Sequence, residues 1–169
     1  MNADQTSKTP SQSAVESRYL VMPDQANPSG TAFGGVIMGW IDMVASLAAQ
    51  RHCKTDIVTV GIDSINFRHP IYIGDHVLLK ASVNYVSRTS MEVGVRVIKE
   101  DPLTGETARA TTAHLTFVAL DKNRKPTPVI PVLPETDDEK RRYENAKLRV
   151  KTRKELLKKI RDADQARNI

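Results

Sequence analysis

One carboxylic acid interrupts the most apolar stretch of this 169-residue chain. Asp42 stands among Val, Ile, Met, Ala and Leu side chains between Val36 and Ala49. An ionised carboxylate in apolar surroundings is costly unless it is paired or hydrogen-bonded. Asp42 therefore either lies on a polar edge or beside an Arg, or it is a catalytic carboxylate at a cleft. The pattern alone leaves both interpretations open.

Two glycines precede this apolar stretch. Gly34 and Gly35 stand where a helix would begin, and free N–H groups there bind an anion or polarise a carbonyl oxygen. Close packing is the alternative reason for such a pair. Gly34 and Asp42 are eight residues apart, which is ~12 Å along a helix axis, so one carbonyl cannot touch both. If both groups serve one reaction, they come from two protomers across a two-fold interface, which predicts at least a dimer.

The remaining reactive side chains form no second catalytic pattern. The four His residues have no short metal-binding spacing, and no Ser or Cys accompanies them in a nucleophile motif. Cys53 is the only cysteine, so neither an internal disulfide nor a thiolate cluster is expected, which fits a reducing cytoplasm. The sequence therefore predicts no metal and no cofactor.

A helix and an antiparallel sheet are predicted to position these groups. Apolar residues on every side from Gly35 to about Arg51 predict a helix enclosed all round. Period-two alternation then predicts strands at about 58–67, 77–85, 91–97 and 108–119, joined by tight turns, after a short strand at 19–22. One apolar helix ahead of such a meander suggests an α+β fold in which the sheet curls around the helix.

Composition divides the chain into a core domain and flanking segments. The polar residues 1–16 predict a disordered leader, and residues 17–121 carry the central helix and the sheet. Residues 122–135 are rich in proline and predict a surface connector without regular structure. Residues 136–169 predict a charged C-terminal helix with Thr136 as its N-cap.

Most of the net positive charge lies in the C-terminal segment. Residues 135–169 hold 12 Lys+Arg and 8 Asp+Glu, so they carry +4 of the net charge of +5. Both signs are interleaved there and Tyr143 is the only aromatic residue, which favours a solvated helix face over a nucleic-acid or membrane surface. The apolar stretch is shorter than the ~20 residues that a bilayer requires. We expect a cytoplasmic protein without a membrane or nucleic-acid partner.

Three segments of the chain resemble a known family. The runs NPSGTAFGGVIMGWIDM, VTVGIDSINFRHPIYIGD and ATTAHLTFVALD, within about residues 17–125, are similar in order and spacing to the hotdog-fold acyl-CoA thioesterases, specifically the bacterial and brain-type cytosolic acyl-CoA hydrolases. This resemblance implies a hotdog fold, with an antiparallel sheet wrapped around a central helix. It also implies hydrolysis of acyl-CoA to free fatty acid and CoA, by a hexamer of three dimers that share active sites.

The resemblance implies roles for residues of the catalytic site. The helix carboxylate, here Asp42, is catalytic, as general base or as nucleophile. The backbone amides near Gly34 and Gly35 receive the thioester oxygen. The side chain of Asn27 helps to place water or the carbonyl, and the hydroxyl of Ser46 holds the water.

Contacts to the rest of acyl-CoA are expected at the end of one strand and at the turn between the next two. The family contacts pantetheine and nucleotide at that turn, where an Arg suits phosphate; an exposed hairpin Arg is the alternative. The residues concerned are Asn66, Phe67 and Arg68 at the strand end, and Arg88, Thr89 and Ser90 at the turn.

Two other functions stay open. A hotdog hydratase or dehydratase acting on acyl-CoA or acyl carrier protein uses a His beside an acid, whereas the position five after Asp24 is Ser29. A non-catalytic protein that binds acyl-CoA or nucleic acid would release no thiol, and its basic tail would be retained on heparin or DNA in a salt-dependent manner.

Overall fold

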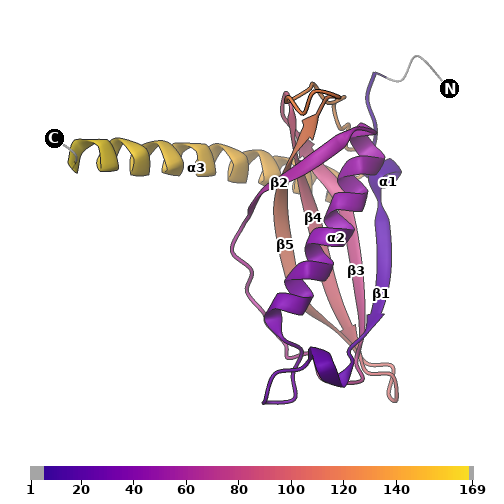
Figure 1. The fold of residues 1–169 in the computed structure, drawn as a ribbon. Helices are drawn as coiled ribbons and strands as arrows, with labels where there is room; N and C mark the ends of the chain where they lie inside the picture. Colours follow the sequence, from indigo (N-terminus) through magenta and orange to yellow (C-terminus); the bar gives the residue numbers. More distant parts are fainter. Residues whose placement is uncertain (1–5, 168–169) are drawn as a thin grey trace. The chain divides into compact units, whose positions relative to one another are not determined.

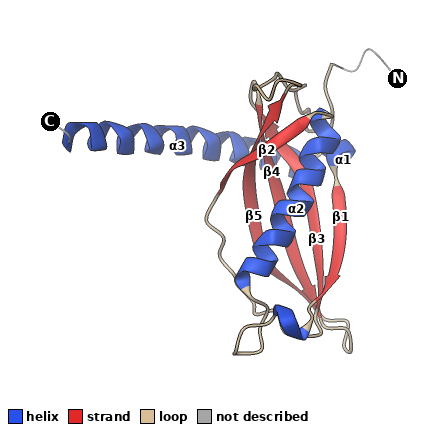
Figure 2. Ribbon diagram, in the orientation of Figure 1, coloured by secondary structure: helices blue, strands red, loops and turns tan. Residues whose placement is uncertain are grey.

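The computed structural model describes residues 6–167, and its main unit is a curved five-stranded antiparallel sheet that wraps around one long helix (Figures 1 and 2). The helix, α2, spans Gly34–Cys53. The strand order in the sheet is β1-β3-β4-β5-β2. The strands are β1 (Val15–Leu20), β2 (Asp56–Ile62), β3 (His76–Val86), β4 (Ser90–Glu100) and β5 (Thr107–Leu120). The α+β fold predicted from the sequence is confirmed.

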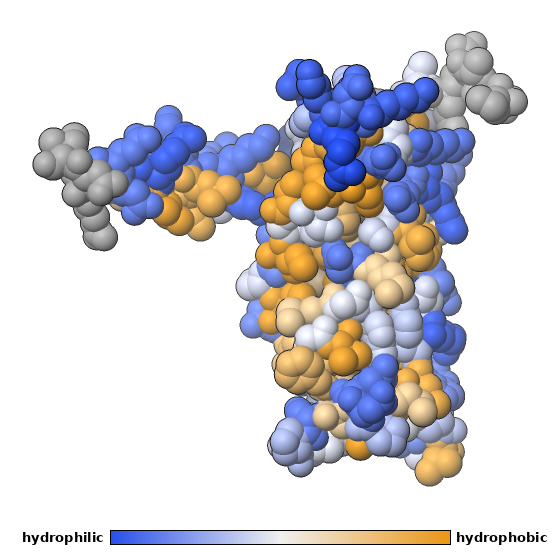
Figure 3. Space-filling view, viewed as in Figure 1, coloured by the Kyte–Doolittle hydropathy of each residue, from blue (hydrophilic) through white to orange (hydrophobic). Residues whose placement is uncertain are grey.

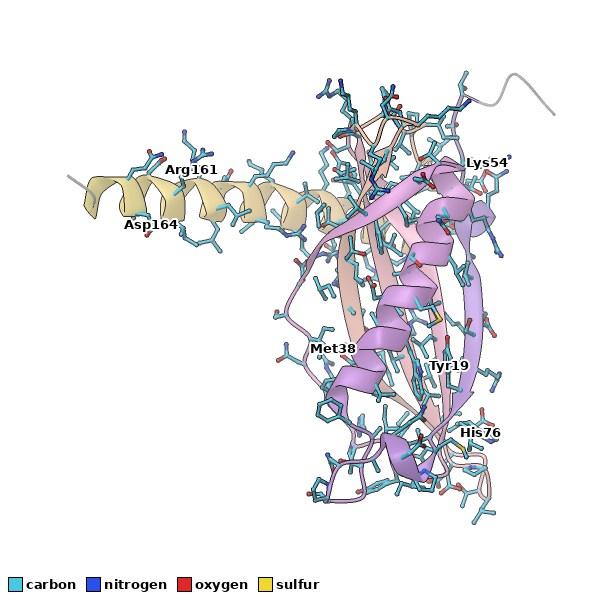
Figure 4. The ribbon with its side chains drawn as sticks, in the orientation of Figure 1. Tyr19, Met38, Lys54, His76, Arg161 and Asp164 are labelled. Carbon is cyan, nitrogen blue, oxygen red and sulfur yellow. The ribbon has the colours of Figure 1, made fainter. Side chains whose placement is uncertain are left out.

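The core lies between α2 and the concave face of the sheet. Alternate residues of β3 and β4 face the helix and are buried, as the period-two pattern predicts. On the helix, Ile37, Ile41, Val44 and Ala48 are buried against them. Where β1 passes the helix, the rings of Tyr19 and Trp40 stack with centroids 4.4 Å apart, and Tyr19 is labelled in Figure 4.

The prediction of a meander is right for three strands and wrong for β2. Strands β3, β4 and β5 pair in sequence order, but β2 pairs with β5 at the opposite side of the sheet from β1. The strand also ends at Ile62 rather than near residue 67. The connection from β2 to β3 contains Pro70 and is too long for a hairpin turn. It lets the chain cross from one edge of the sheet to the other side.

The prediction that α2 is enclosed all round is wrong within this chain. Its outer side exposes Met38, Met43 and Leu47, and Figure 3 shows apolar surface in the same region. The neighbouring strand β2 also turns its apolar side chains outward: Val58, Val60 and Ile62 are 41%, 55% and 44% exposed. Contiguous apolar surface of this kind is typical of an interaction site.

The predicted disordered leader, residues 1–16, is wrong from residue 8 onward; residues 1–5 lie outside the described residues. A short helix, α1 (Pro10–Ser13), precedes β1. The buried hydroxyl of Ser13 donates to the carbonyl of Pro10 (2.7 Å) and accepts from the amide of Val83 (2.9 Å). Lys8 Nζ donates to the carbonyl of His52 at 2.5 Å, where a cation offsets the dipole at the end of α2.

The connector at residues 122–135 has neither helix nor strand, as its prolines predict, but it is firmly attached. The amide of Thr127 donates to Ala119 (2.9 Å), and that of Val129 donates to Arg88 (3.1 Å). Val129 and Val132 are buried. The connector therefore contributes to the core as well as covering the surface.

The second unit, Pro134–Ile169, consists of one helix, α3 (Asp137–Arg167). The amide of Glu139 donates to the Thr136 hydroxyl (3.2 Å), and the Glu139 carboxylate accepts from the amide of Thr136 (3.1 Å). This capping box confirms Thr136 as the N-cap. Burial raises the pKa of Glu139, but hydrogen bonds from the amides of Glu135 and Thr136 act together with the charge of Arg142 to hold that pKa below its usual value. None of the described helices is long and apolar enough to cross a membrane.

His52 provides a test of the packing at the end of α2. Its ring is 1% exposed, and Nε2 lies 3.0 Å from the carbonyl oxygen of Ile130. Burial lowers the pKa of His52 below 6.5, because desolvation penalises the charged ring.

Below the unfolded-state pKa of about 6.5, the unfolded chain binds a proton that the folded chain resists, so the free energy of unfolding should fall as the pH drops from 7.5 to 5.5. His52→Gln keeps a donor for Ile130 but does not titrate, and should lose less stability over this range. Urea unfolding at fixed protein concentration measures both slopes. If the free energy of unfolding changes equally with pH in the two proteins, His52 is not the group that causes the change.

Candidate active site

Asp42 lies midway along α2, on its half-buried side, and its partner is a hydroxyl group. Thr59 Oγ1 on β2 donates a hydrogen bond of 3.0 Å to Asp42 Oδ1. No Lys, Arg or His forms an ion pair with this carboxylate within residues 6–167. The interpretation that Asp42 pairs with an Arg is therefore wrong, and its second carboxylate oxygen has no protein donor in the described chain.

Gly34 and Gly35 are the first two residues of α2, as predicted within one residue. Phe33 precedes them with an extended backbone (φ −63°, ψ 127°) and provides no side-chain cap. Its carbonyl accepts from the amide of Val36 at 2.9 Å. The two glycine amides have no acceptor among the described residues, so they can donate to an incoming oxygen.

The Asp42 carboxylate and the glycine amides stand on the same helix, as the sequence predicts. A continuous helix fixes their separation at ~12 Å along its axis. The carbonyl oxygen of one bound ester cannot reach the amides of Gly34 while its carbon contacts Asp42 of the same chain. The structure therefore does not bring these two groups together within one protomer.

A cavity of about 220 Å³ lies at the start of α2. Segments from three parts of the chain form it: the loop before α2, the helix itself and the connection from β2 to β3. Its lining residues are Thr31, Ala32, Gly34, Ile37, Phe67, His69, Pro70 and Ile71. The cavity is mainly apolar and is bounded by the first turn of α2, which suits an acyl chain or a thioester beside the glycine amides.

Asn27 organises the loop that leads into α2. Its Nδ2 donates to the Thr31 hydroxyl (2.8 Å), and its Oδ1 accepts from the amide of Ser29 (2.9 Å). Its backbone amide also donates to the carbonyl of Thr31 (2.8 Å). The Asn27 side chain holds the loop, and none of its hydrogen bonds to the described residues is to Asp42.

Ser46 lies one turn after Asp42 on α2, as the sequence spacing requires. Its hydroxyl donates to the carbonyl of Met43 at 2.8 Å. A Ser that bonds back to the preceding turn still has its lone pairs available as acceptors. Ser46 is therefore placed to hold a water molecule but is not bonded to Asp42.

The other predicted substrate contacts fall into two separate places. Phe67 lies at the apolar cavity, where its ring is near Gly34. Asn66 and Arg68 line a second, polar cavity with Arg109, Thr111 and Thr112. The turn that carries Arg88, Thr89 and Ser90 lies beside Ala119, near the other end of β5, and lines neither cavity. The structure separates the two groups that the sequence assigned to CoA.

Two features of the site escaped the sequence analysis. Thr59 is a common residue type in strands and does not stand out in the sequence. Only strand alternation, which puts its side chain on the other face from Val58 and Val60, could have indicated that it points toward α2. Arg109 gave no signal, because its position beside Arg68 depends on strand pairing. No group of three His, Cys, Asp or Glu side chains in residues 6–167 could hold a metal ion.

Comparisons with known proteins agree with this fold. A model of the thioesterase superfamily matches residues 29–106. A Bacillus subtilis protein named as the uncharacterized acyl-CoA thioester hydrolase YkhA is 46% identical over 143 residues, covering 85% of this chain and 83% of that protein. The rat cytosolic acyl coenzyme A thioester hydrolase is 39% identical over 76% of this chain and 34% of its own length.

Solved structures are similar over nearly the whole chain. An apo-hexameric acyl-CoA thioesterase superposes with a TM-score of 0.86 at 41% identity, covering 89% of this chain and 97% of the other. The acyl-CoA hydrolase of Staphylococcus aureus was solved with butyryl coenzyme A and coenzyme A. It superposes with a TM-score of 0.87 at 35% identity, covering 96% of this chain and 99% of the other. Further structures of that enzyme carry Ala in place of one Asp, one Thr or one Asn.

The curved sheet around a central helix is the hotdog fold. With a relative 46% identical over most of both chains, this chain belongs to the thioesterase superfamily.

The two glycines make a matched pair for testing the helix start. A Cβ on Gly35 would lie 2.5 Å from a ring carbon of Phe33, whereas a Cβ on Gly34 meets nothing closer than 3.8 Å. Ala is favoured over Gly in a helix by about 1 kcal/mol.

Gly34→Ala should therefore leave the free energy of unfolding unchanged or raised. Gly35→Ala should be less stable than Gly34→Ala by about 1 kcal/mol, because the Phe33 ring must leave its rotamer. Urea unfolding of the two variants measures the difference. If both variants are equally stable, Phe33 does not constrain Gly35.

Proposed function

We propose that this chain hydrolyses acyl-CoA to a free fatty acid and CoA, with Asp42 as general base or nucleophile. The observation that carries the proposal is the Asp42 carboxylate, which is half-buried, free of any cationic partner in the described residues and oriented by the Thr59 hydroxyl. A carboxylate held in this way can accept a proton from water or attack a carbonyl carbon.

Two routes lead to the products. As general base, Asp42 takes a proton from water while the water oxygen bonds to the thioester carbon; the C–S bond then breaks, and the sulfur of CoA takes the proton from Asp42 as it leaves. As nucleophile, Asp42 itself displaces CoA and forms an anhydride, which water then cleaves. In both routes the amides of Gly34 and Gly35 stabilise the negative charge that develops on the carbonyl oxygen. Thioesters are poorly resonance-stabilised, so these groups are sufficient without a metal.

We further propose that each site is shared by two protomers, with Asp42 from one and the amides of Gly34 and Gly35 from the other. The fixed ~12 Å separation along α2 requires a second copy. The exposed apolar side chains of α2 and β2 offer a surface for it. Solved relatives at 41% and 31% identity are named as hexameric, and we propose the same assembly here, as a trimer of dimers.

The Staphylococcus aureus enzyme supports the choice of residues. Its Ala variants replace an Asn, an Asp and a Thr that have the same order and the same spacings along the chain as Asn27, Asp42 and Thr59. We assign Thr59 to orientation of the carboxylate. Asn27 shapes the loop beside the apolar cavity at the start of α2. Ser46 holds the attacking water.

Other predicted residues are assigned to binding of the substrate. Phe67 contacts the acyl part of the substrate at the apolar cavity. Asn66, Arg68, Arg88, Thr89 and Ser90 are proposed contacts to CoA, which is part of the substrate and not a cofactor. The rat relative named as cytosolic supports a cytoplasmic location.

Replacing Asp42 tests the proposal directly. Asp42→Asn keeps the shape of the side chain but removes the base and nucleophile, so kcat should fall about 10²- to 10⁴-fold. Thiol release from acyl-CoA of several chain lengths measures the rate, with circular dichroism and light scattering as controls for folding and assembly. Full turnover by the folded variant would remove Asp42 from the mechanism. Absence of thiol release by the wild type would favour a binding protein instead.

Thr59 gives a second, finer test. Thr59→Val keeps the volume but removes the hydroxyl that donates to Asp42, and kcat should fall about tenfold because one hydrogen bond to a charged group is lost. Thr59→Ser keeps the donor and should retain most of the activity. The thiol-release assay compares the two variants. A full rate in Thr59→Val would show that this hydrogen bond does not orient the base.

A further inference from the structure

A polar cavity of about 150 Å³ lies on the sheet at the edge formed by β5 and the chain after β2. It contrasts with the apolar cavity at the start of α2, because no aliphatic or aromatic side chain lines it. Its lining residues are Asn66, Arg68, Arg109, Thr111 and Thr112. Two guanidinium groups, one side-chain amide and the hydroxyl of Thr112 therefore face the same space.

A β-bulge in β5 brings Arg109 to this cavity. Val97 on β4 pairs with Thr111, and the next residue, Ile98, pairs with Arg109, so Ala110 is the extra residue. In a regular strand Arg109 and Thr112 would point to opposite faces. The bulge places both on the face away from α2, which is a typical use of bulges near functional sites.

Hydrogen bonds hold the other wall of the cavity against β5. Beyond the end of β2, the amide of Asp63 donates to His114 (3.0 Å) and the amide of Arg68 donates to Ala110 (2.8 Å). The hydroxyl of Thr111 donates to the carbonyl of Asn66 (3.0 Å). The backbone under both Arg side chains is therefore fixed, although their guanidinium groups are exposed and accessible to a ligand.

The charge of the cavity is positive and uncompensated. Within residues 6–167 neither Arg68 nor Arg109 forms an ion pair or a side-chain hydrogen bond, and no Asp or Glu lines the cavity. Two permanent cations side by side repel each other unless an anion lies between them. Guanidinium groups match the geometry of phosphate oxygens, which they bind with paired N–H groups.

We propose that this cavity binds a phosphate group, and that the phosphate belongs to the coenzyme part of acyl-CoA; the inference rests on the proposed function. The position supports the substrate as its source. Along one extended segment, Phe67 and His69 line the apolar cavity while Asn66 and Arg68 line the polar one. The two cavities therefore lie next to each other, on opposite sides of this segment. Arg88 lines no cavity and is not required for this site.

Steady-state kinetics with two substrates test the proposal. The same acyl group is supplied as acyl-CoA and as acyl-pantetheine, which lacks every phosphate. Arg68→Gln and Arg109→Gln should each raise KM for acyl-CoA about tenfold without changing kcat, because a charge-assisted hydrogen bond is lost. Both variants should treat acyl-pantetheine as the wild type does. Arg124→Gln, which removes the same charge from a turn elsewhere, should change neither KM.

Calorimetric titration with CoA and with ADP separates this inference from the proposed function. Weaker CoA binding by both variants supports the phosphate site even if the wild type hydrolyses no thioester. ADP that competes with acyl-CoA also supports it. ADP that binds without competition would assign the site to a separate nucleotide and overturn the substrate assignment. If Arg68→Gln and Arg109→Gln bind CoA as tightly as the wild type does, the cavity does not bind its phosphate. This holds even if light scattering shows that the variants assemble differently.

Discussion

The rigidity of one helix constrains the chemistry of this protein. Asp42 and the amides of Gly34 and Gly35 lie on the same continuous element, and neither side-chain rotation nor loop movement can bring them to one carbonyl. Their separation is set by helix geometry alone. If both act on one thioester, the catalytic unit is a pair of chains. The exposed apolar side chains of α2 and β2 are consistent with this, because a lone chain would leave them in water.

The sheet supports this arrangement in two ways. Its concave face buries one side of α2 and leaves the side that carries Met38, Met43 and Leu47 available to another chain. Its edge strand β2 supplies Thr59, whose hydroxyl orients the carboxylate from across the helix–sheet boundary. Burying the charge of Asp42 costs free energy. The hydrogen bond from Thr59 and partial exposure to water offset part of that cost. The same edge of the sheet continues into the segment that separates the apolar cavity at the start of α2 from the proposed phosphate site.

Local periodicity allowed the sequence to predict α2 and the strands β3 to β5, and residue type alone predicted Thr136 as the N-cap of α3. Asp42 was recognisable because an acid contrasts with an apolar surrounding. The position of β2 was not predictable, since the alternation of Val58 and Val60 defines two faces but not a neighbouring strand. The ordered residues 8–16 were missed because Ser13 is buried through hydrogen bonds rather than apolar contact. The meeting of Arg68 and Arg109 depends on a bulge that composition does not reveal.

A crystal structure of Asp42→Ala with an intact acyl-CoA would test the shared site most directly. The decisive measurements are the distances from the thioester oxygen to the amides of Gly34 and Gly35 and from the thioester carbon to residue 42 of each chain. We predict that the oxygen accepts hydrogen bonds of about 3 Å from the glycine amides of one protomer, while the carbon faces residue 42 of its neighbour. A thioester whose oxygen lies away from both glycine amides, or whose carbon faces residue 42 of the same chain, would contradict it.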